Sequence, residues 1–229
     1  MLDNFRRLSL YMILLIIIFF PRSTLAEESL TDSQWFEQGY LYEEKGDYDN
    51  AISAYAKAIE LNPQSAMAYN NRGNAYSFKG QYAEAMKDYT RAIQLNNDML
   101  ASQYAYNNRG MLYARRDQSD WAINDFNNAI RLNPQFADAY YNRGIAFNAM
   151  EKYEFALADY NKALELNPQY AYAYYGRGNT LAILGKHDEA IRNFNLFLQY
   201  AVPGDPWIEK AQQRIKTLWA KTEIVITEY

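Results

Sequence analysis

The feature that most constrains this chain is a group of residues that recurs about every 34 positions. Glycines recur with spacings of 34, 37, 34 and 34, at Gly39, Gly73, Gly110, Gly144 and Gly178. The same four spacings separate the alanines Ala51, Ala85, Ala122, Ala156 and Ala190, and the aromatic residues Tyr55, Tyr89, Phe126, Tyr160 and Phe194. Three registers that move together indicate an internal repeat of one structural unit.

Each repeat predicts a pair of helices. In the second repeat, the first helix is expected from Ala66 to about Lys79 and the second from about Tyr82 to Leu95, where Ala85 and Tyr89 follow a helical spacing. Gly80 marks the turn between them. Leu-Asn-Pro ends the second helix at 61–63, 132–134 and 166–168, because the residue before proline is disfavoured in the α region.

The recurring glycine predicts close packing between helices. Glycine inside a helix costs about 1 kcal/mol relative to alanine. Its return in every unit therefore indicates that another helix approaches the backbone there. A single pair of helices cannot bury all of its apolar surface, so the pairs are expected to stack on one another.

These landmarks resemble the tetratricopeptide repeat (TPR) family, whose unit has 34 residues. The resemblance implies an all-α, right-handed superhelical solenoid of five helix-turn-helix units and a C-terminal capping helix. The expected units are 32–65, 66–99, 103–136, 137–170 and 171–204. Two departures are visible: Asn97 replaces the usual proline, with three extra residues around Asp98–Ser102, and Phe197 replaces a small alanine. The insertion predicts a longer turn and a local change of superhelical pitch.

A capping helix is expected at 205–221. Asp205 and Pro206 fit an N-cap and a first helical residue, and an apolar stripe from Ile208 to Trp219 follows them. The tail at 222–229 ends in a β-prone sequence. Packing against the cap and pairing with the edge of a partner are both open for it.

The N-terminus predicts export. Arg6 and Arg7 precede an apolar run at 8–20, and small residues surround a candidate cleavage site after Ala26. This is the pattern of a signal peptide at 1–26, followed by a short linker at 27–31. An uncleaved signal anchor is the alternative, although the run is short for a membrane span. Both place the repeats outside the cytoplasm, in the periplasm or at the cell surface of a bacterial envelope.

Composition excludes several classes of function. The chain carries a net charge of −4, which becomes −6 without residues 1–26, so a basic surface for nucleic acid is not expected. There is no cysteine for a disulfide, a thiolate nucleophile or a cysteine-rich zinc site. His187 is the only histidine and occupies a position where other units have tyrosine. We therefore expect no enzyme activity, catalytic residue, metal site or cofactor.

The resemblance implies that the first helices line a concave groove. Asn71, Asn108 and Asn142 recur there, and in some relatives a ladder of asparagines binds the backbone of an extended peptide. An amide suits this task because it donates and accepts hydrogen bonds. The alternative is that these asparagines solvate the groove or bridge adjacent helices. The candidate peptide-binding residues are Asn70, Asn71, Asn74, Asn107, Asn108, Tyr141, Asn142, Tyr175 and Asn179.

A second recurring pair predicts an internal ion contact. An arginine precedes the glycine in four units, at Arg72, Arg109, Arg143 and Arg177; sixteen residues later stand Asp88, Asp125 and Asp159, but Asn193 in the fifth unit. The first unit has Gln38 and Ala54 at these positions, so both charges are missing together. The pattern predicts an Arg–Asp contact between the two helices of a unit.

The sequence therefore favours a scaffold or adaptor that binds an extended peptide or a helix of a partner protein in its groove. Contact with a membrane is expected only through the N-terminal segment, if it is not cleaved. Three alternatives are a self-assembling structural protein, a chaperone-like holder, and a binder of lipid or glycan through the tyrosine-rich groove. Arg115 is the only inner-face cation expected, which disfavours a clamp for a C-terminal carboxylate.

Overall fold

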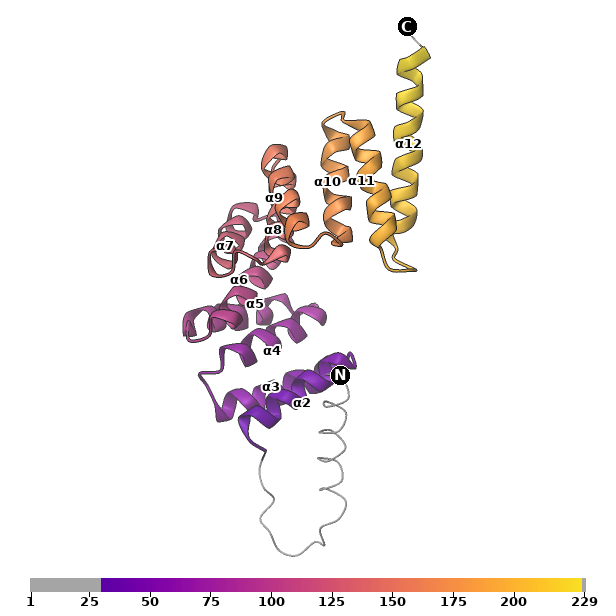
Figure 1. Cartoon of the computed structure of the whole chain (residues 1–229). Helices are drawn as coiled ribbons and strands as arrows, with labels where there is room; N and C mark the ends of the chain where they lie inside the picture. The colour runs from indigo at the N-terminus through magenta and orange to yellow at the C-terminus, as the bar shows by residue number, and fades with distance from the viewer. Residues whose placement is uncertain (1–29, 228–229) are drawn as a thin grey trace, which may run out of the picture. The chain divides into compact units, whose positions relative to one another are not determined.

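The computed structural model of this chain describes residues 30–227, with side-chain environments up to residue 220. The predicted signal segment at 1–26, residues 27–29 of the linker and residues 228–229 lie outside the described residues. The described residues from 32 onward form one compact unit. Its described part contains eleven α-helices and no strand, and the helices follow one another in chain order (Figure 1).

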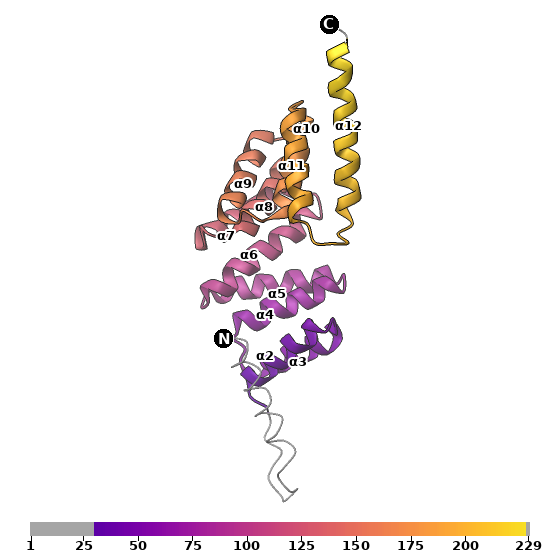
Figure 2. The same ribbon diagram turned by 45° about the vertical axis from the view of Figure 1, so that its right-hand side comes forward.

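Ten helices form five antiparallel pairs. The first helices of the pairs are α2 (Asp32–Glu44), α4 (Ala66–Phe78), α6 (Met99–Ala114), α8 (Ala137–Ala149) and α10 (Ala171–Ile183). The second helices are α3 (Tyr48–Leu61), α5 (Tyr82–Leu95), α7 (Ser119–Leu132), α9 (Tyr153–Leu166) and α11 (His187–Tyr200). Each second helix also packs on the next first helix, so the pairs build the solenoid that the repeat predicts (Figure 2).

The helix ends follow local sequence signals. The Ser65 side chain accepts a hydrogen bond from the Ala68 backbone and caps α4, and the Asp47 side chain caps α3 in the same way. The turn within each pair requires a residue with positive φ. Glycine supplies it in three units, at Gly46, Gly80 and Gly185, whereas Asp117 and Glu151 adopt it with a side chain.

The core repeats the same contact in each pair. The aromatic ring of the second helix lies against the glycine of the first helix. A Cβ atom added to Gly73 would lie 2.7 Å from Cε1 of Tyr89, so no larger residue fits unless the buried ring moves. The matching alanines, Ala51, Ala85, Ala122, Ala156 and Ala190, are fully buried. The predicted close approach at the glycine is confirmed.

The expected longer turn after the second unit is wrong. Only three residues, 96–98, separate α5 from α6, whereas four follow the second helix of the first, third and fourth units. Asn96 ends α5 in the left-handed conformation, and the Asp98 side chain accepts a hydrogen bond from the Ala101 backbone. Because this cap lies before the extra residues, they join α6 as an additional helical turn instead of lengthening the loop.

The C-terminal helix α12 (Trp207–Thr227) packs on α11 and is longer than the predicted cap. The Asp205 carboxylate accepts a hydrogen bond from the Trp207 backbone, as an N-cap does. Residues 222–227, which the sequence marks as the start of a β-prone tail, continue the helix. Extending a helix that has already formed costs little, and this outweighs the β-preference of a short segment. No helix among the described residues has the length and apolarity to cross a membrane.

Candidate functional site

The candidate site is the face formed by the first helices, called the inner face below. α2, α4, α6, α8 and α10 contact one another in series, and no comparable set of contacts joins successive second helices in the described part of the chain. The first helices therefore lie on the side where the stack is tighter. This geometry agrees with the concave side that the sequence predicts.

Asparagine side chains of α4, α6 and α8 form hydrogen bonds between adjacent first helices across this face. The Asn108 side-chain amide donates to the Oδ1 atoms of Asn70, at 3.2 Å, and Asn74, at 2.9 Å. The Asn142 amide donates to Oδ1 of Asn107 at 3.0 Å. The asparagines thus bridge adjacent helices, which is one of the two roles left open by the sequence.

Neighbouring asparagines on one helix are also joined. Asn70 donates to Asn71 and Asn107 donates to Asn108, at 3.1 and 3.4 Å. Asn70 and Asn107 are buried, whereas Asn71, Asn108 and Asn142 are half-buried. The half-buried amides are fixed in orientation by the network and still border solvent.

The tyrosines predicted for the groove contribute more to packing than to an open surface. Tyr141 is half-buried, with its ring centroid 4.9 Å from that of Tyr170, and burial raises the pKa of its hydroxyl to about 12. Tyr175 is also half-buried and meets Phe197 and Trp207 edge to face, at 5.2 and 5.0 Å. Tyr141 of α8 contacts the residue that precedes α10, and Tyr175 of α10 contacts the first residue of α12. Both rings therefore join one helix pair to the next element of the chain.

Asn179 lies apart from the asparagine network, on α10. Its Oδ1 atom is buried and has no hydrogen-bond partner among the described residues. Asn179 borders a cavity of about 140 Å³ that Arg214 and Leu218 of α12 also line. The structure therefore places Asn179 beside the C-terminal helix, away from the asparagines of α4, α6 and α8.

Exposed apolar residues lie beside the asparagine network, and they are absent from the candidate site predicted from the sequence. Tyr40, Met111 and Ile145 are 50%, 43% and 41% exposed. They occupy the register of Asn74, one turn after the recurring asparagine, with the spacing of the repeat. Tyr104, one turn before Asn108, is 38% exposed. The repeat spacing itself was the signal that could have identified them.

The inner face carries little charge at its centre. The Arg115 guanidinium stacks over the ring of Tyr82, 4.7 Å from its centroid, at the start of α5. Acidic groups lie at the first unit, where Glu43 accepts a hydrogen bond from the Tyr55 hydroxyl at 2.9 Å. Burial raises the pKa of Glu43, and the bond from Tyr55 opposes this shift. Over α6 and α8, the inner face presents the amides of Asn108 and Asn142 and the apolar side chains of Met111 and Ile145.

The predicted Arg–Asp contacts are confirmed in three units. Arg72, Arg109 and Arg143 each donate two hydrogen bonds of 2.7–2.9 Å to Asp88, Asp125 and Asp159. In the fifth unit Arg177 donates a single bond to Asn193.

His187 is half-buried at the start of α11. No group of three potential metal ligands occurs among the described residues.

Solved structures resemble this stack of helices. MamA is 30% identical, with a TM-score of 0.61, and the match covers 71% of this chain and 93% of MamA. A TPR protein from Parabacteroides merdae is 26% identical, with a TM-score of 0.65, covering 84% of this chain and 73% of its own. YrrB, described as a TPR protein with an unusual peptide-binding site, is 22% identical, with a TM-score of 0.59 and coverages of 79% and 91%.

Family comparisons agree with the structural ones. Curated protein sequences give no significant match. The tetratricopeptide repeat family matches residues 66–99 and 137–170, and two further TPR families match 39–77 and 110–150, and 159–192. Together these matches cover more than half of the chain, and those at 66–99 and 137–170 coincide with the second and fourth helix pairs. The chain therefore belongs to the tetratricopeptide repeat family.

Proposed function

We propose that this TPR protein is an exported scaffold that binds an extended, weakly charged segment of a partner polypeptide across the inner faces of α4, α6 and α8. TPR proteins bind protein or peptide partners, and YrrB is described as having a peptide-binding site. The observation that carries the proposal is the row of exposed apolar residues, Met111 and Ile145 above all, beside amides already fixed by hydrogen bonds.

The chemistry of the inner face selects the ligand. Met111, Ile145 and Tyr104 offer apolar contact to alternate side chains of an extended segment. Asn108 and Asn142 border this row and offer their side-chain oxygens to N–H groups of the peptide backbone. Because the network holds these amides in place before binding, little side-chain entropy is lost when the segment binds.

A displayed library of extended peptides tests this function with the full-length chain. We expect the selected peptides to carry apolar residues and few charges, and to lose binding when Met111→Gln and Ile145→Gln are introduced together. Leu61→Gln is the matched control, because Leu61 is an exposed apolar residue of a second helix. Peptides that bind the double variant as tightly as the unchanged protein would refute the inner face as the site.

The exported location has its own basis, the segment from Arg6 to Ala26. N-terminal sequencing of the protein recovered from the cell envelope distinguishes a mature chain that begins at Glu27 from an uncleaved anchor. Recovery of the chain only from the cytoplasm would contradict export and leave the peptide-binding proposal unaffected.

A further inference from the structure

A cavity of about 370 Å³ lies between the fourth and fifth helix pairs, away from the inner face. Its lining includes Leu157 and Asn161 of α9, Arg177 and Leu181 of α10, and Arg192 and Asn193 of α11. Lys186 and Glu189 complete the charged part of the lining. Three cations and one carboxylate give the cavity a net positive charge in a chain that is otherwise acidic.

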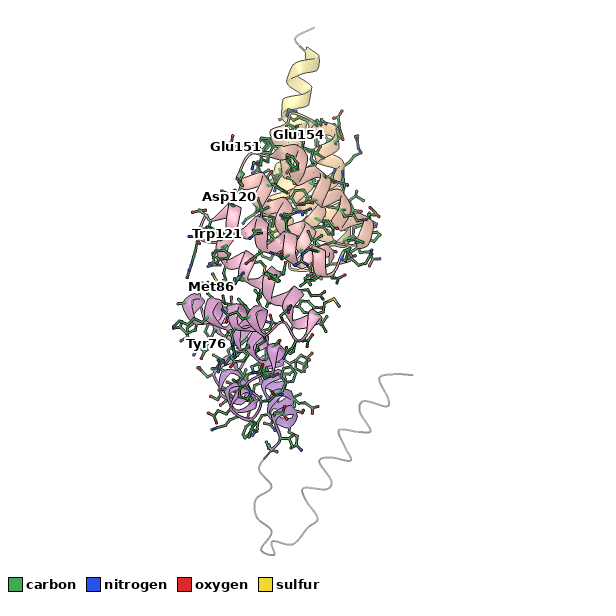
Figure 3. All side chains as sticks on the ribbon, turned by 90° about the vertical axis from the view of Figure 1, so that its left-hand side faces the viewer. Tyr76, Met86, Asp120, Trp121, Glu151 and Glu154 are labelled. Carbon is green, nitrogen blue, oxygen red and sulfur yellow. The ribbon has the colours of Figure 1, made fainter. Side chains whose placement is uncertain are left out.

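The equivalent place in the third and fourth units is filled by two aromatic side chains whose rings contact each other at a tilt. Tyr113 and Trp121 lie there in the third unit, with ring centroids 6.1 Å apart, and Phe147 and Phe155 in the fourth, at 5.3 Å. Figure 3 shows Trp121 at the surface of α7. In the fifth unit the same two positions hold Leu181 and Glu189. The loss of both rings leaves the space that forms the cavity.

The arginine beneath this space also differs from its counterparts. In the other units its Nη2 atom donates to the second carboxylate oxygen of the aspartate. Asn193 has no second carboxylate oxygen, and the structure shows no hydrogen bond from Nη2 of Arg177 to a described residue. No described carboxylate forms an ion pair with Arg177.

One aromatic partner of this guanidinium is missing as well. Arg109 lies over both Tyr106 and Tyr113, whereas Arg177 lies over Tyr174 alone, 5.4 Å from its centroid. Burial lowers the pKa of Arg177, while the hydrogen bond to Asp88 raises that of Arg72. Glu189, which lines the same cavity, acts on Arg177 electrostatically but forms no ion pair with it. A partly buried guanidinium without a direct ion pair is unfavourable, and an added anion would relieve the cost.

We propose that this cavity, called the Arg177 cavity, binds a carboxylate group supplied from outside the chain. The carboxylate takes the role that Asp88, Asp125 and Asp159 have in the other units, and it accepts from Nη2 of Arg177. Lys186 and Arg192 add attraction at the rim. The Nδ2 group of Asn161, whose Oδ1 already accepts from Nη1 of Arg177, provides a polar contact beside it. The group comes either from an acidic side chain of a polypeptide or from a free organic acid.

NMR titration of the full-length chain tests the Arg177 cavity. The Nε–H signal of Arg177, assigned by its loss in Arg177→Lys, is followed during addition of a blocked Gly-Glu-Gly peptide, a blocked Gly-Gln-Gly peptide, and glutarate. We expect a saturable shift with the glutamate peptide or glutarate and none with the glutamine peptide. Tighter binding of the glutamate peptide assigns the carboxylate to polypeptide, and tighter binding of glutarate assigns it to a free acid.

Variants separate this site from general attraction of anions. Asn193→Asp restores the internal carboxylate, and Leu181→Phe restores a ring; each is expected to weaken binding at least tenfold. Asp159→Asn is the matched control, because it removes the carboxylate from Arg143 but leaves Phe147 and Phe155 above it, and no saturable shift of Arg143 is expected. Equal shifts with both peptides, or unchanged affinity in Asn193→Asp, would overturn the proposal.

Discussion

The Arg109 guanidinium and the Asp125 carboxylate form a two-bond contact between the helices of the third unit. Nε lies 2.7 Å from Oδ2 and Nη2 lies 2.9 Å from Oδ1. The aspartate side chain is almost fully buried, with 3% exposure, and that of the arginine is 16% exposed. Since Arg109 also bonds Thr90 of the preceding pair, the contact joins three helices.

Replacing this carboxylate by an amide should weaken the fold. Asp125→Asn removes the negative charge that faces the Arg109 guanidinium, which itself stays charged. We therefore expect a loss of about 2–3 kcal/mol in the free energy of unfolding. Urea denaturation followed by circular dichroism measures it. Asn193→Asp is the opposite change and is expected to increase stability. A stable Asp125→Asn variant would show that the contact adds only specificity.

The contacts within a unit were predictable because the repeat presents the same pair of positions several times. Arg72 and Asp88 could be paired from sequence since both are absent together from the first unit. Contacts between units were not predictable in this way. The superhelical geometry sets how closely α4 and α6 approach, and Asn108 bonds Asn70 because these two helices lie close together. Tyr175 is half-buried for the same reason, since its ring meets Trp207 at the start of α12.

The turns of the third and fourth units should gain stability from glycine. Asp117 and Glu151 have φ angles of 57° and 59°, where a side chain is unfavourable; Figure 3 shows Glu151 at its turn. We expect Asp117→Gly or Glu151→Gly to raise the free energy of unfolding by about 0.5–1 kcal/mol after the larger entropy of the unfolded chain is included. Thermal denaturation measures the gain.

Gly80→Ala is the control for this prediction. Gly80 has a φ of 74° at the matching position, and an added Cβ would meet no atom within 4 Å. Any loss of stability in Gly80→Ala therefore reports backbone conformation alone. A Gly80→Ala variant as stable as the unchanged protein would contradict the gain expected from glycine at residues 117 and 151.

Glu43 should make stability depend on pH. Burial raises its pKa above the ordinary value of 4.5 in the folded chain. The folded state therefore binds a proton more readily than the unfolded state, and this contribution to stability is present below pH 4.5 and lost as pH rises through the raised pKa. Glu43→Gln keeps an oxygen for the Tyr55 hydroxyl, so it should be more stable than the unchanged protein at pH 7 but not at pH 4.

Urea midpoints at the two pH values measure this difference. Glu44→Gln, at the exposed neighbouring residue, is the control and should change neither midpoint by a comparable amount. A Glu43→Gln variant that is less stable at pH 7 would mean that the charge-assisted bond from Tyr55 outweighs the cost of burying the carboxylate.

Phe197 should decide whether the C-terminal helix docks. It stands where the family has a small alanine, and it is fully buried among Tyr172, Tyr175 and the apolar residues of α12, including Ala211 and Leu218. Phe197→Ala restores the family residue but removes the ring on which α12 packs. We expect a loss of about 3–5 kcal/mol, because the surrounding side chains cannot fill the cavity.

Hydrogen exchange locates the effect of Phe197→Ala. Faster exchange is expected along α12 and the adjoining part of α11, while α4 to α7 keep the protection of the unchanged protein, since each pair contacts only its neighbours. Uniformly faster exchange through the whole array would instead show that the fifth pair and α12 stabilise every unit. In that case Phe197 acts on the cooperativity of the array and not on the docking of one helix.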